Sequence, residues 1–388
     1  MRASDVLRPL VRELYRSASV LVERKADSSA FTIADGLVQE LLTRHLFRSG
    51  FAAVVGEEDA SNTELTRRPY HVSSLPVPAE LHDGIDAARA AINLLSAELG
   101  AASYGDCTVF IDPIDGTKEF SSGLGEQCTI LVGFAVGGRP CAGLVYRPLS
   151  EPLSWAAGCG AERYFEAALD DKHAQRTTST APNAAGLLTT NGAISGFLEA
   201  LLSGLAQRGA PGSASAGAAS LASSAPAAAS TTTATPEARG PGPAAPGRVM
   251  AGGVGNKVLS MIEGRGACYI SDRGVSRWDT CAAQAVLEAR GGLLAKLAPA
   301  LRDGTLESYT YRRSSVNLDF DGRDPVALTP HNAAGEAAKG ALASGAQDLK
   351  PYANVCGLLA LDRGAAEDLP AYLDLLRKAA REASPVFD

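Results

Sequence analysis

Several features that would point to a function class are missing from this sequence. Its seven cysteines are scattered singly, with no C-x-x-C pair and no cluster of cysteine and histidine, which argues against a structural zinc site. The formal net charge of −7 lacks the excess of Lys and Arg that a nucleic-acid polymer requires. Lone cysteines among apolar residues favour reduced thiols, and hence a cytoplasmic protein.

Long apolar segments are missing as well. No apolar run approaches the roughly 20 residues that cross a bilayer, and the N-terminus lacks the pattern of a secretory signal. We therefore expect neither a membrane nor a nucleic-acid polymer as partner. A small phosphate-bearing ligand stays compatible with the charge, because a local basic pocket needs only a few cations. The sequence indicates no particular oligomeric state.

Residues 209–247 differ in composition from the rest of the chain. They consist almost entirely of Ala, Ser, Thr, Gly and Pro, and only Glu237 and Arg239 are charged. Such a tract cannot bury enough apolar surface to offset the entropy that is lost on ordering. We predict a disordered insertion between two secondary-structure elements, with a partner-binding role as the alternative.

The remaining sequence has the patterns of a globular protein, with 46% hydrophobic and 20% charged residues in 388. Apolar residues at helical spacing predict helices over 4–23, from 32 or 34 to about 47, and over 83–99, 257–263, 279–290 and 366–382. Short apolar runs predict strands over 52–55, 107–111, 127–135, 140–146 and 267–271, with a hairpin over 152–165. Residues 293–350 show little periodicity, and we expect them to be mostly loop.

The most informative segment is DPIDGTKEF, residues 112–120, which follows the β-branched run 108–111. Asp112 and Asp115 stand where a strand breaks into a turn, Pro113 fixes one backbone torsion, and Gly116 leaves backbone N–H groups unobstructed. A hard divalent cation needs clustered oxygen ligands, and a phosphate needs free N–H donors. The segment therefore predicts metal-assisted phosphate chemistry.

Further acids stand at strand ends and helix starts. Asp35 lies near the start of a predicted helix, Glu57 and Glu58 follow the strand 52–55, and Asp279 opens another helix. Each of them alone fits an ordinary helix cap. Together they fit a site for more than one metal ion, assembled by folding from distant segments.

Three motifs in order carry a resemblance to a known family: GEED at 56–59, DPIDGT at 112–117 and WDTCA at 278–282. They resemble the signatures of the inositol monophosphatase superfamily, whose members are magnesium-dependent, lithium-sensitive phosphomonoesterases. The resemblance implies an α+β or α/β fold, a layered αβαβα sandwich. It implies an N-terminal subdomain over 1–165 with most metal ligands, a C-terminal subdomain over 166–208 and 248–388, and the insertion 209–247 between them.

The resemblance also assigns roles to residues of this chain. Two or three Mg²⁺ ions are expected on Glu57, Asp112, Asp115, Asp279 and the carbonyl of Ile114. Catalysis is expected from a water that a bound metal makes acidic. Thr117, hydrogen-bonded to Asp35, would orient that water and help to deprotonate it. Glu58 is expected beside the ligands rather than on the metal.

Substrate contacts are expected from backbone and cationic groups. The N–H groups of Gly116 and Thr117 would hold the scissile phosphate, together with the start of the helix after Trp278. A non-scissile phosphate needs a cation, for which Lys257 is the first candidate and Arg277 the second. Inhibition by Li⁺ is expected from the resemblance alone.

Two branches of the superfamily compete for the substrate. The segments 32–40 and 352–360, and the long insertion between Glu58 and Asp112, look closer to inositol polyphosphate 1-phosphatase, which removes the 1-phosphate from inositol 1,4-bisphosphate. The segments 118–120 and 252–257 are typical of 3′(2′),5′-bisphosphate nucleotidases, which convert adenosine 3′,5′-bisphosphate to AMP. After Thr189-Thr190, where nucleotidases commonly have a histidine, this chain has Asn191. We favour the inositol branch.

A third hypothesis belongs to another class, a catalytically silent regulatory protein that binds partners through residues 209–247. Loss of one of the three aspartates of the motifs would favour it. Asp112, Asp115 and Asp279 are all present, which argues for an enzyme.

Overall fold

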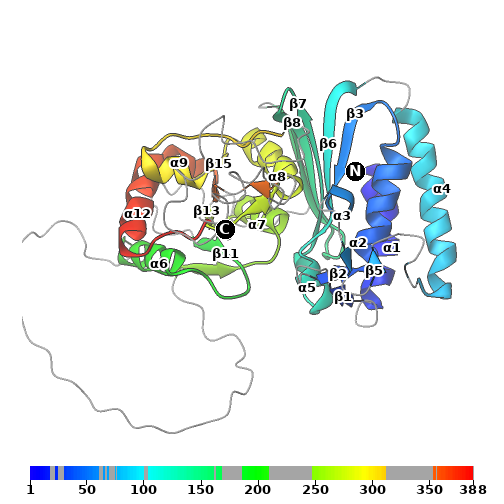
Figure 1. The fold of residues 1–388 in the computed structure, drawn as a ribbon, viewed down its shortest axis with the longest axis horizontal. Coiled ribbons are helices and arrows are strands. Elements are labelled where there is room, and N and C mark those ends of the chain that lie inside the picture. The colour runs from blue at the N-terminus through cyan, green and yellow to red at the C-terminus, as the bar shows by residue number, and fades with distance from the viewer. Residues whose placement is uncertain are drawn as a thin grey trace, which may run out of the picture.

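The computed structural model describes residues 1–17, 22–24, 30–60, 64–65, 68–69, 75, 77–99, 104–160, 163–167, 186–208, 247–311, 353–354 and 356–387. Its elements form five layers, and layers of helices alternate with the two sheets along the long axis of the molecule (Figure 1). The predicted αβαβα sandwich is confirmed. The predicted disorder of 209–247 falls, except for Gly247, outside the described residues.

The first sheet has six strands in the order β10-β9-β8-β7-β6-β3. β3 runs parallel to β6, and the other neighbours are antiparallel. Five of the six strands come from consecutive chain, joined by short connections, as the hairpin signals predicted. The strands are β3 (Phe51–Gly56), β6 (Tyr104–Asp115), β7 (Thr129–Val136), β8 (Arg139–Arg147), β9 (Ser154–Cys159) and β10 (Arg163–Ala167).

One face of this sheet is covered by the N-terminal helices, as Figure 1 shows on its right-hand side. They are α1 (Arg2–Arg16), α2 (Ile33–Glu40), the π-helical turn η2 (Leu41–Leu46) and α4 (His82–Leu99). In α1 four apolar residues recur at helical spacing and are buried: Leu7, Leu10, Val11 and Leu14. The predicted helices near 34–47 and over 83–99 are therefore confirmed in position. The helix predicted over 4–23 ends at Arg16, because residues 22–24 pair with residues 30–32 as a strand instead.

The second sheet has five strands in the order β12-β11-β13-β17-β15. They are β11 (Leu187–Thr189), β12 (Arg248–Met250), β13 (Cys268–Ser271), β15 (Leu293–Lys296) and β17 (Leu358–Leu361). β15 and the helix α9 (Leu297–Arg302) fall where we expected mostly loop, so that prediction is wrong for residues 293–302. Their apolar run LLAKLAPAL is too short to show a period, and burial between neighbouring elements decides its structure.

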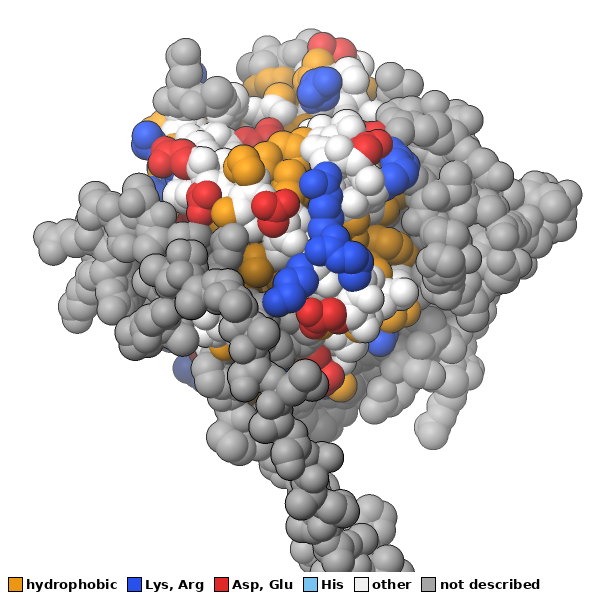
Figure 2. Space-filling view, turned by 90° about the vertical axis from the view of Figure 1, so that its left-hand side faces the viewer, with side chains coloured by type: hydrophobic (Ala, Val, Ile, Leu, Met, Phe, Trp, Pro, Cys, Tyr) orange, Lys and Arg blue, Asp and Glu red, His pale blue; other side chains and the backbone are white. Residues whose placement is uncertain are grey.

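Two helices lie between the sheets, and others cover the outside. α7 (Val254–Ile262) and α8 (Arg277–Ala289) fill the middle layer, while α6 (Gly196–Arg208), α9 and α12 (Leu369–Glu382) form the outer one (Figure 1). Figure 2 shows this outer face, where Lys and Arg side chains gather among acidic and apolar ones. α12 turns its apolar residues inward: Tyr372, Leu375, Leu376 and Ala379 are buried.

Short elements complete the fold. They are β1 (Val22–Arg24), β2 (Ala30–Thr32), α3 (Glu57–Ala60), β4 (Glu64–Leu65), β5 (Arg68–Pro69), η4 (Ala79–Leu81), α5 (Thr117–Ser121), η5 (Gly125–Gln127), β14 (Val275–Ser276), β16 (Ala353–Asn354) and α11 (Arg363–Glu367). The seven cysteines all lie in described residues and are free. Among the described helices, none combines the length and apolarity needed to cross a membrane. The predicted division into two subdomains stays a prediction.

A row of glycines brings α8 onto the first sheet. Gly133, Gly143 and Gly158 face one another across β7, β8 and β9. A Cβ at Gly143 would lie 2.6 Å from the carbonyl oxygen of Ala282, and one at Gly158 would lie 2.5 Å from that of Ala285. α8 therefore rests directly on the sheet backbone, an approach that any larger side chain would prevent.

We predict that Gly143→Ala lowers the free energy of unfolding by about 1–3 kcal/mol, because the added methyl group meets backbone that cannot yield. Urea denaturation followed by circular dichroism measures the change. Gly84→Ala is the matched control, since Gly84 lies in α4 with only the end of Glu13 within 3.5 Å. That control is expected to be neutral or to stabilise by up to about 1 kcal/mol. Equal stability of both variants would contradict the backbone contact.

Candidate metal centre

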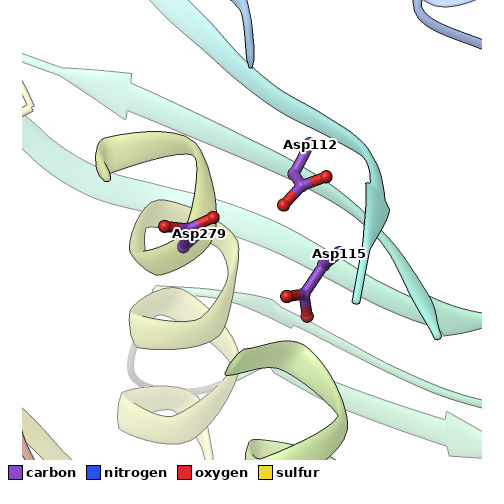
Figure 3. Close-up of side chains that lie close together, drawn as sticks. All are labelled: Asp112, Asp115 and Asp279. Atoms are coloured by element: carbon purple, nitrogen blue, oxygen red, sulfur yellow. The ribbon is translucent and has the colours of Figure 1, made fainter. Parts of the chain in front are cut away.

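Three aspartates converge at the junction of β6 and α8. Oxygen atoms of Asp112, Asp115 and Asp279 all lie within 4.8 Å of one another, close enough to share a metal ion. Figure 3 shows Asp112 and Asp115 at the end of β6, facing Asp279 on the first turn of α8. Folding thus joins the second and third sequence motifs, as the sequence predicted.

A bulge at the end of β6 aims the first two aspartates. Asp112 pairs with Leu131 and Asp115 with Thr129. An advance of three residues along β6 therefore matches an advance of two along β7, which is a bulge in β6. Pro113 fits at this interruption because it has no N–H for the ladder. The backbone N–H of Ile114 donates to Asp112 Oδ1 at 3.1 Å, which fixes that carboxylate beside the turn.

The third aspartate is fixed by a helix cap. Ser276 and Asp279 form a reciprocal capping box at the start of α8, in which the Ser276 N–H donates to Asp279 Oδ2 at 2.6 Å. The carboxylate therefore sits at the positive end of the helix dipole, which favours its charged form. One oxygen of this carboxylate lies within 4.8 Å of oxygens of the other two aspartates.

Asp115 is held by donors from two other segments. Thr129 Oγ1 donates to its Oδ2 at 2.7 Å, while the N–H groups of Val254 and Gly255 reach Oδ1 at 2.9 Å and Oδ2 at 2.7 Å. A Cβ at Gly253 would lie 2.6 Å from the same carboxylate, and Gly253 has φ of +59°. Only glycine lets the backbone before α7 come this close.

Burial and neighbouring negative charges make the ionised forms of this trio of aspartates unfavourable. Burial raises the pKa of Asp112 well above its usual range, and the charges of Glu57, Asp115 and Asp279 raise it further. Burial, with the charges of Asp115 and Glu57, raises the pKa of Asp279 to about 7. Burial also raises the pKa of Asp115, although the donors from Thr129 and α7 and the charge of Lys257 oppose it. Such a cluster is stabilised by a cation placed among its oxygens.

The residues fit a hard divalent ion. Carboxylate oxygens from three aspartates are the donors that Mg²⁺ prefers, and no thiol or imidazole belongs to this group within the described residues. Their mutual repulsion and burial supply the energetic reason for binding.

Glu57 and Glu58 lie at the edge of the trio. Gly56 of β3 pairs with Ile111 of β6, so the acids that follow β3 come beside Asp112. Glu57 is half-buried and outside the 4.8 Å group of described residues, yet its charge raises the pKa of Asp112. Glu58 is 1% exposed, and its N–H donates to Gln39 Oε1 at 2.8 Å.

The predicted pair of Asp35 and Thr117 exists. Thr117 Oγ1 lies 3.0 Å from Asp35 Oδ1 and 3.1 Å from the carbonyl oxygen of Ile114, so its one proton has two acceptors. Thr32 donates to Asp35 Oδ2 through its N–H at 2.8 Å and its hydroxyl at 2.6 Å. Asp35 is fully buried, and this pairing joins residues 82 apart in the chain.

The residues predicted to bind the substrate lie at the beginnings of three helices. Gly116 has φ of +94° and precedes the short helix α5, a backbone conformation that favours glycine. Lys257 is buried; its Nζ donates to the carbonyl of Gly253 at 2.8 Å and lies 4.9 Å from the centre of the Tyr269 ring. Arg277 is 1% exposed at the start of α8. Contacts of both cations with a second phosphate stay predictions.

Sequence reasoning missed several residues around the trio. Thr129 and the amides of Val254 and Gly255 bind Asp115, and Asn191 Nδ2 donates to both Glu119 Oε1 and Gln127 Oε1 at 2.9 Å. The glycines at 252, 253 and 255 were a signal for the close approach of this backbone to another group. No sequence signal singled out Thr129 or Gln127.

The chain is similar to known proteins. A model described as the inositol monophosphatase family matches residues 2–319. The 3′(2′),5′-bisphosphate nucleotidase 1 of Mus musculus is 27% identical over 276 residues, which cover 71% of this chain and 73% of the relative. The Golgi-resident adenosine 3′,5′-bisphosphate 3′-phosphatase of Rattus norvegicus is 43% identical over 49 residues, 13% of this chain and 14% of the relative. An IMPase structure from Thermotoga maritima matches with a TM-score of 0.49 and 12% identity, covering 98% of this chain and 96% of the other.

The raised pKa of Asp279 predicts how the metal-free protein responds to pH. Its pKa rises from an ordinary 3.8 to about 7, so the folded state binds the extra proton. That contribution to stability is complete below pH 4 and is lost as the pH rises through about 7. Asp279→Asn, which imitates the protonated form, should therefore stabilise the metal-free protein by about 1–3 kcal/mol at pH 8 and by little near pH 4.

Melting temperatures in EDTA between pH 4 and 9 measure this effect. Asp303→Asn is the control of opposite sign, because the hydrogen bonds of Thr305 lower the pKa of exposed Asp303 to about 2. That variant should lose stability at neutral pH. A destabilising Asp279→Asn at pH 8 would show that the trio is not under charge repulsion.

Proposed function

The chain belongs to the inositol monophosphatase family, and from this premise we propose that it is a magnesium-dependent phosphatase of 3′(2′),5′-bisphosphate nucleotides such as adenosine 3′,5′-bisphosphate. The observation that carries the chemistry is the convergence of three aspartate carboxylates within 4.8 Å at the junction of β6 and α8. These residues supply the oxygen cluster that metal-assisted phosphate hydrolysis needs.

The choice of a nucleotide rests on two supports. A curated relative that is 27% identical over 71% of this chain is named a bisphosphate nucleotidase. The two segments typical of nucleotidases, 118–120 and 252–257, also meet in space: the side chain of Glu119 packs so closely on Gly252 that no Cβ would fit there. The second segment also borders Asp115, whose carboxylate lies against Gly253.

The metal would be held by Asp112, Asp115 and Asp279, with Glu57 and the carbonyl of Ile114 as the further oxygen ligands. When bound, Mg²⁺ supplies positive charge to the phosphoryl oxygens and makes a water more acidic. Thr117 orients the attacking water: its Oγ1 accepts a proton from the water while its own proton passes to Asp35 Oδ1, 3.0 Å away. Thr32 fixes the other oxygen of Asp35 through two hydrogen bonds, so the acceptor stays aligned.

The phosphate would be held by the N–H groups of Gly116 and Thr117, at the turn where Gly116 has a positive φ. Lys257 stabilises charge near this turn, because its positive charge opposes the rise in the pKa of Asp115. Lys257 and Arg277 are the proposed cations for the second phosphate. Glu58, which is buried and follows Glu57 in the chain, would support that ligand rather than bind the metal.

A second substrate, inositol 1,4-bisphosphate, is favoured by one observation. Asn191 follows Thr189-Thr190, where nucleotidases commonly have a histidine, and its amide nitrogen is engaged by Glu119 and Gln127. A side chain tied back to the protein offers less to a nucleotide base. This candidate ranks second because the relative matched over 71% of the chain is named a bisphosphate nucleotidase.

Phosphate release tests the substrate. With Mg²⁺, the protein should release phosphate from adenosine 3′,5′-bisphosphate with a higher kcat/KM than from inositol 1,4-bisphosphate, and Li⁺ should inhibit. Asp115→Asn should lower kcat by about 10³-fold, because it weakens the proposed metal site by several kcal/mol. Asp303→Asn, in an exposed turn, is the matched control and should keep full activity. Hydrolysis of neither substrate by the wild-type protein would refute the proposal.

Thr117 gives a separate test of the water-orienting pair. Thr117→Val keeps the shape of the side chain but removes the hydroxyl, and should lower kcat by about 10²-fold with little change in Mg²⁺ affinity. Thr117→Ser restores the hydroxyl and should recover kcat to within about tenfold of wild type. A Thr117→Val variant with the kcat of the wild type would show that the hydroxyl takes no part in proton transfer.

A further inference from the structure

We propose that Gln39 is a positioning residue of the metal site, which fixes the turn 56–58 so that Glu57 faces the three aspartates. The inference deepens the proposed function and rests on its metal site. Gln39 belongs to none of the acidic motifs, and its side chain is 1% exposed in the helix α2.

The contact between Gln39 and this turn is close and directional. Gln39 Oε1 accepts the N–H of Glu58 at 2.8 Å, which is the N–H of the second residue of the four-residue helix α3. α3 is too short to be stable alone, so a donor in its first turn needs a partner from elsewhere. Gln39 supplies that partner from another helix.

Gly56 makes the approach possible. A Cβ on Gly56 would lie 2.6 Å from Gln39 Cδ and 2.7 Å from Gln39 Oε1. The amide group of Gln39 therefore lies flat against the backbone immediately before Glu57. The same β3 residue pairs with Ile111 on β6, next to Asp112, so the amide holds the turn where β3 brings its acids to the trio.

The nitrogen end of the amide is evidence that a glutamine at this position does not serve stability. Its Nε2 is buried and has no hydrogen-bond partner among the described residues. An unpaired buried N–H group costs about 1–3 kcal/mol. A residue that is unfavourable for folding but sits beside a proposed ligand is expected to serve the site.

Gln39 also stands one helical turn after Asp35, which places both on the same face of α2. α2 would thus fix two parts of the site together: Asp35 accepts from Thr117 at 3.0 Å, and Gln39 holds the turn of Glu57. The water-orienting pair and the edge of the metal site then share one rigid support.

Two variants with opposite expectations test the inference. Gln39→Met fills the same space without polar atoms: it removes the unpaired Nε2 but leaves the Glu58 N–H unpaired, so the melting temperature without metal should stay close to wild type. Its Mg²⁺ affinity, measured by calorimetric titration, should fall about tenfold. Gln39→Glu keeps an oxygen for the Glu58 N–H, so it should bind Mg²⁺ within about threefold of wild type. Its metal-free melting temperature should fall, because it adds a charge beside Glu57 and Glu58.

The control is Thr43→Val, one turn further along the same helical segment. It removes the hydrogen bond from Thr43 Oγ1 to the carbonyl of Gln39 at 2.9 Å, yet should leave Mg²⁺ affinity unchanged. A purely structural role predicts that affinity follows melting temperature in both Gln39 variants, and that result would overturn the inference. Unchanged Mg²⁺ affinity in Gln39→Met would overturn it too. Because binding is measured directly, a wild-type protein that binds Mg²⁺ but hydrolyses neither bisphosphate refutes the proposed function, while the Gln39 variants still decide this inference.

Discussion

Repulsion among buried carboxylates is the constraint on which this structure depends. Asp112, Asp115 and Asp279 come from two elements and meet within 4.8 Å, with the charge of Glu57 directed at them. Burial and mutual charge raise the pKa of all three aspartates. A chain that folds in this way stores an unfavourable interaction, which a bound cation relieves. The proposed metal is therefore a part of the electrostatic balance of the fold as well as of the chemistry.

Other features of the fold hold these charges together against their repulsion. The glycine row lets α8 lie on the backbone of the first sheet, which brings Asp279 to the end of β6. The amides at the start of α7 and the hydroxyl of Thr129 give Asp115 three donors. Behind α7, the buried ion pair of Arg147 and Glu263 joins that helix to β8. Packing between layers thus acts on the site through the positions of α7 and α8.

Much of the site could be predicted from local sequence, because its motifs combine a strand, a turn and an acid within a few residues. DPIDGT at 112–117 predicted two aspartates that lie together at a turn, and the hydrogen bond of Thr117 to Asp35, which followed from the family resemblance, is present at 3.0 Å. The donors to Asp115 and the contact of Gln39 with Glu58 depend on how α7 and α2 pack, which no local pattern encodes. β15 and α9 were missed for the same reason, since their apolar run becomes regular only between neighbouring elements.

One segment that could affect the choice of substrate lies apart from the residues that would carry chemistry. The acids lie on β6, α8 and the turn after β3, whereas the segment after β11 borders the site through Asn191, which bonds Glu119 and Gln127. Arg248 braces this segment, because it donates to the carbonyl oxygens of Thr190 at 3.1 Å and Gly192 at 2.7 Å. Because these hydrogen bonds hold the backbone of the segment, its side chains can be substituted without displacing the acids. Substrate preference can therefore differ between relatives that share the same metal chemistry, which explains why the acidic motifs identify the reaction more sharply than the substrate.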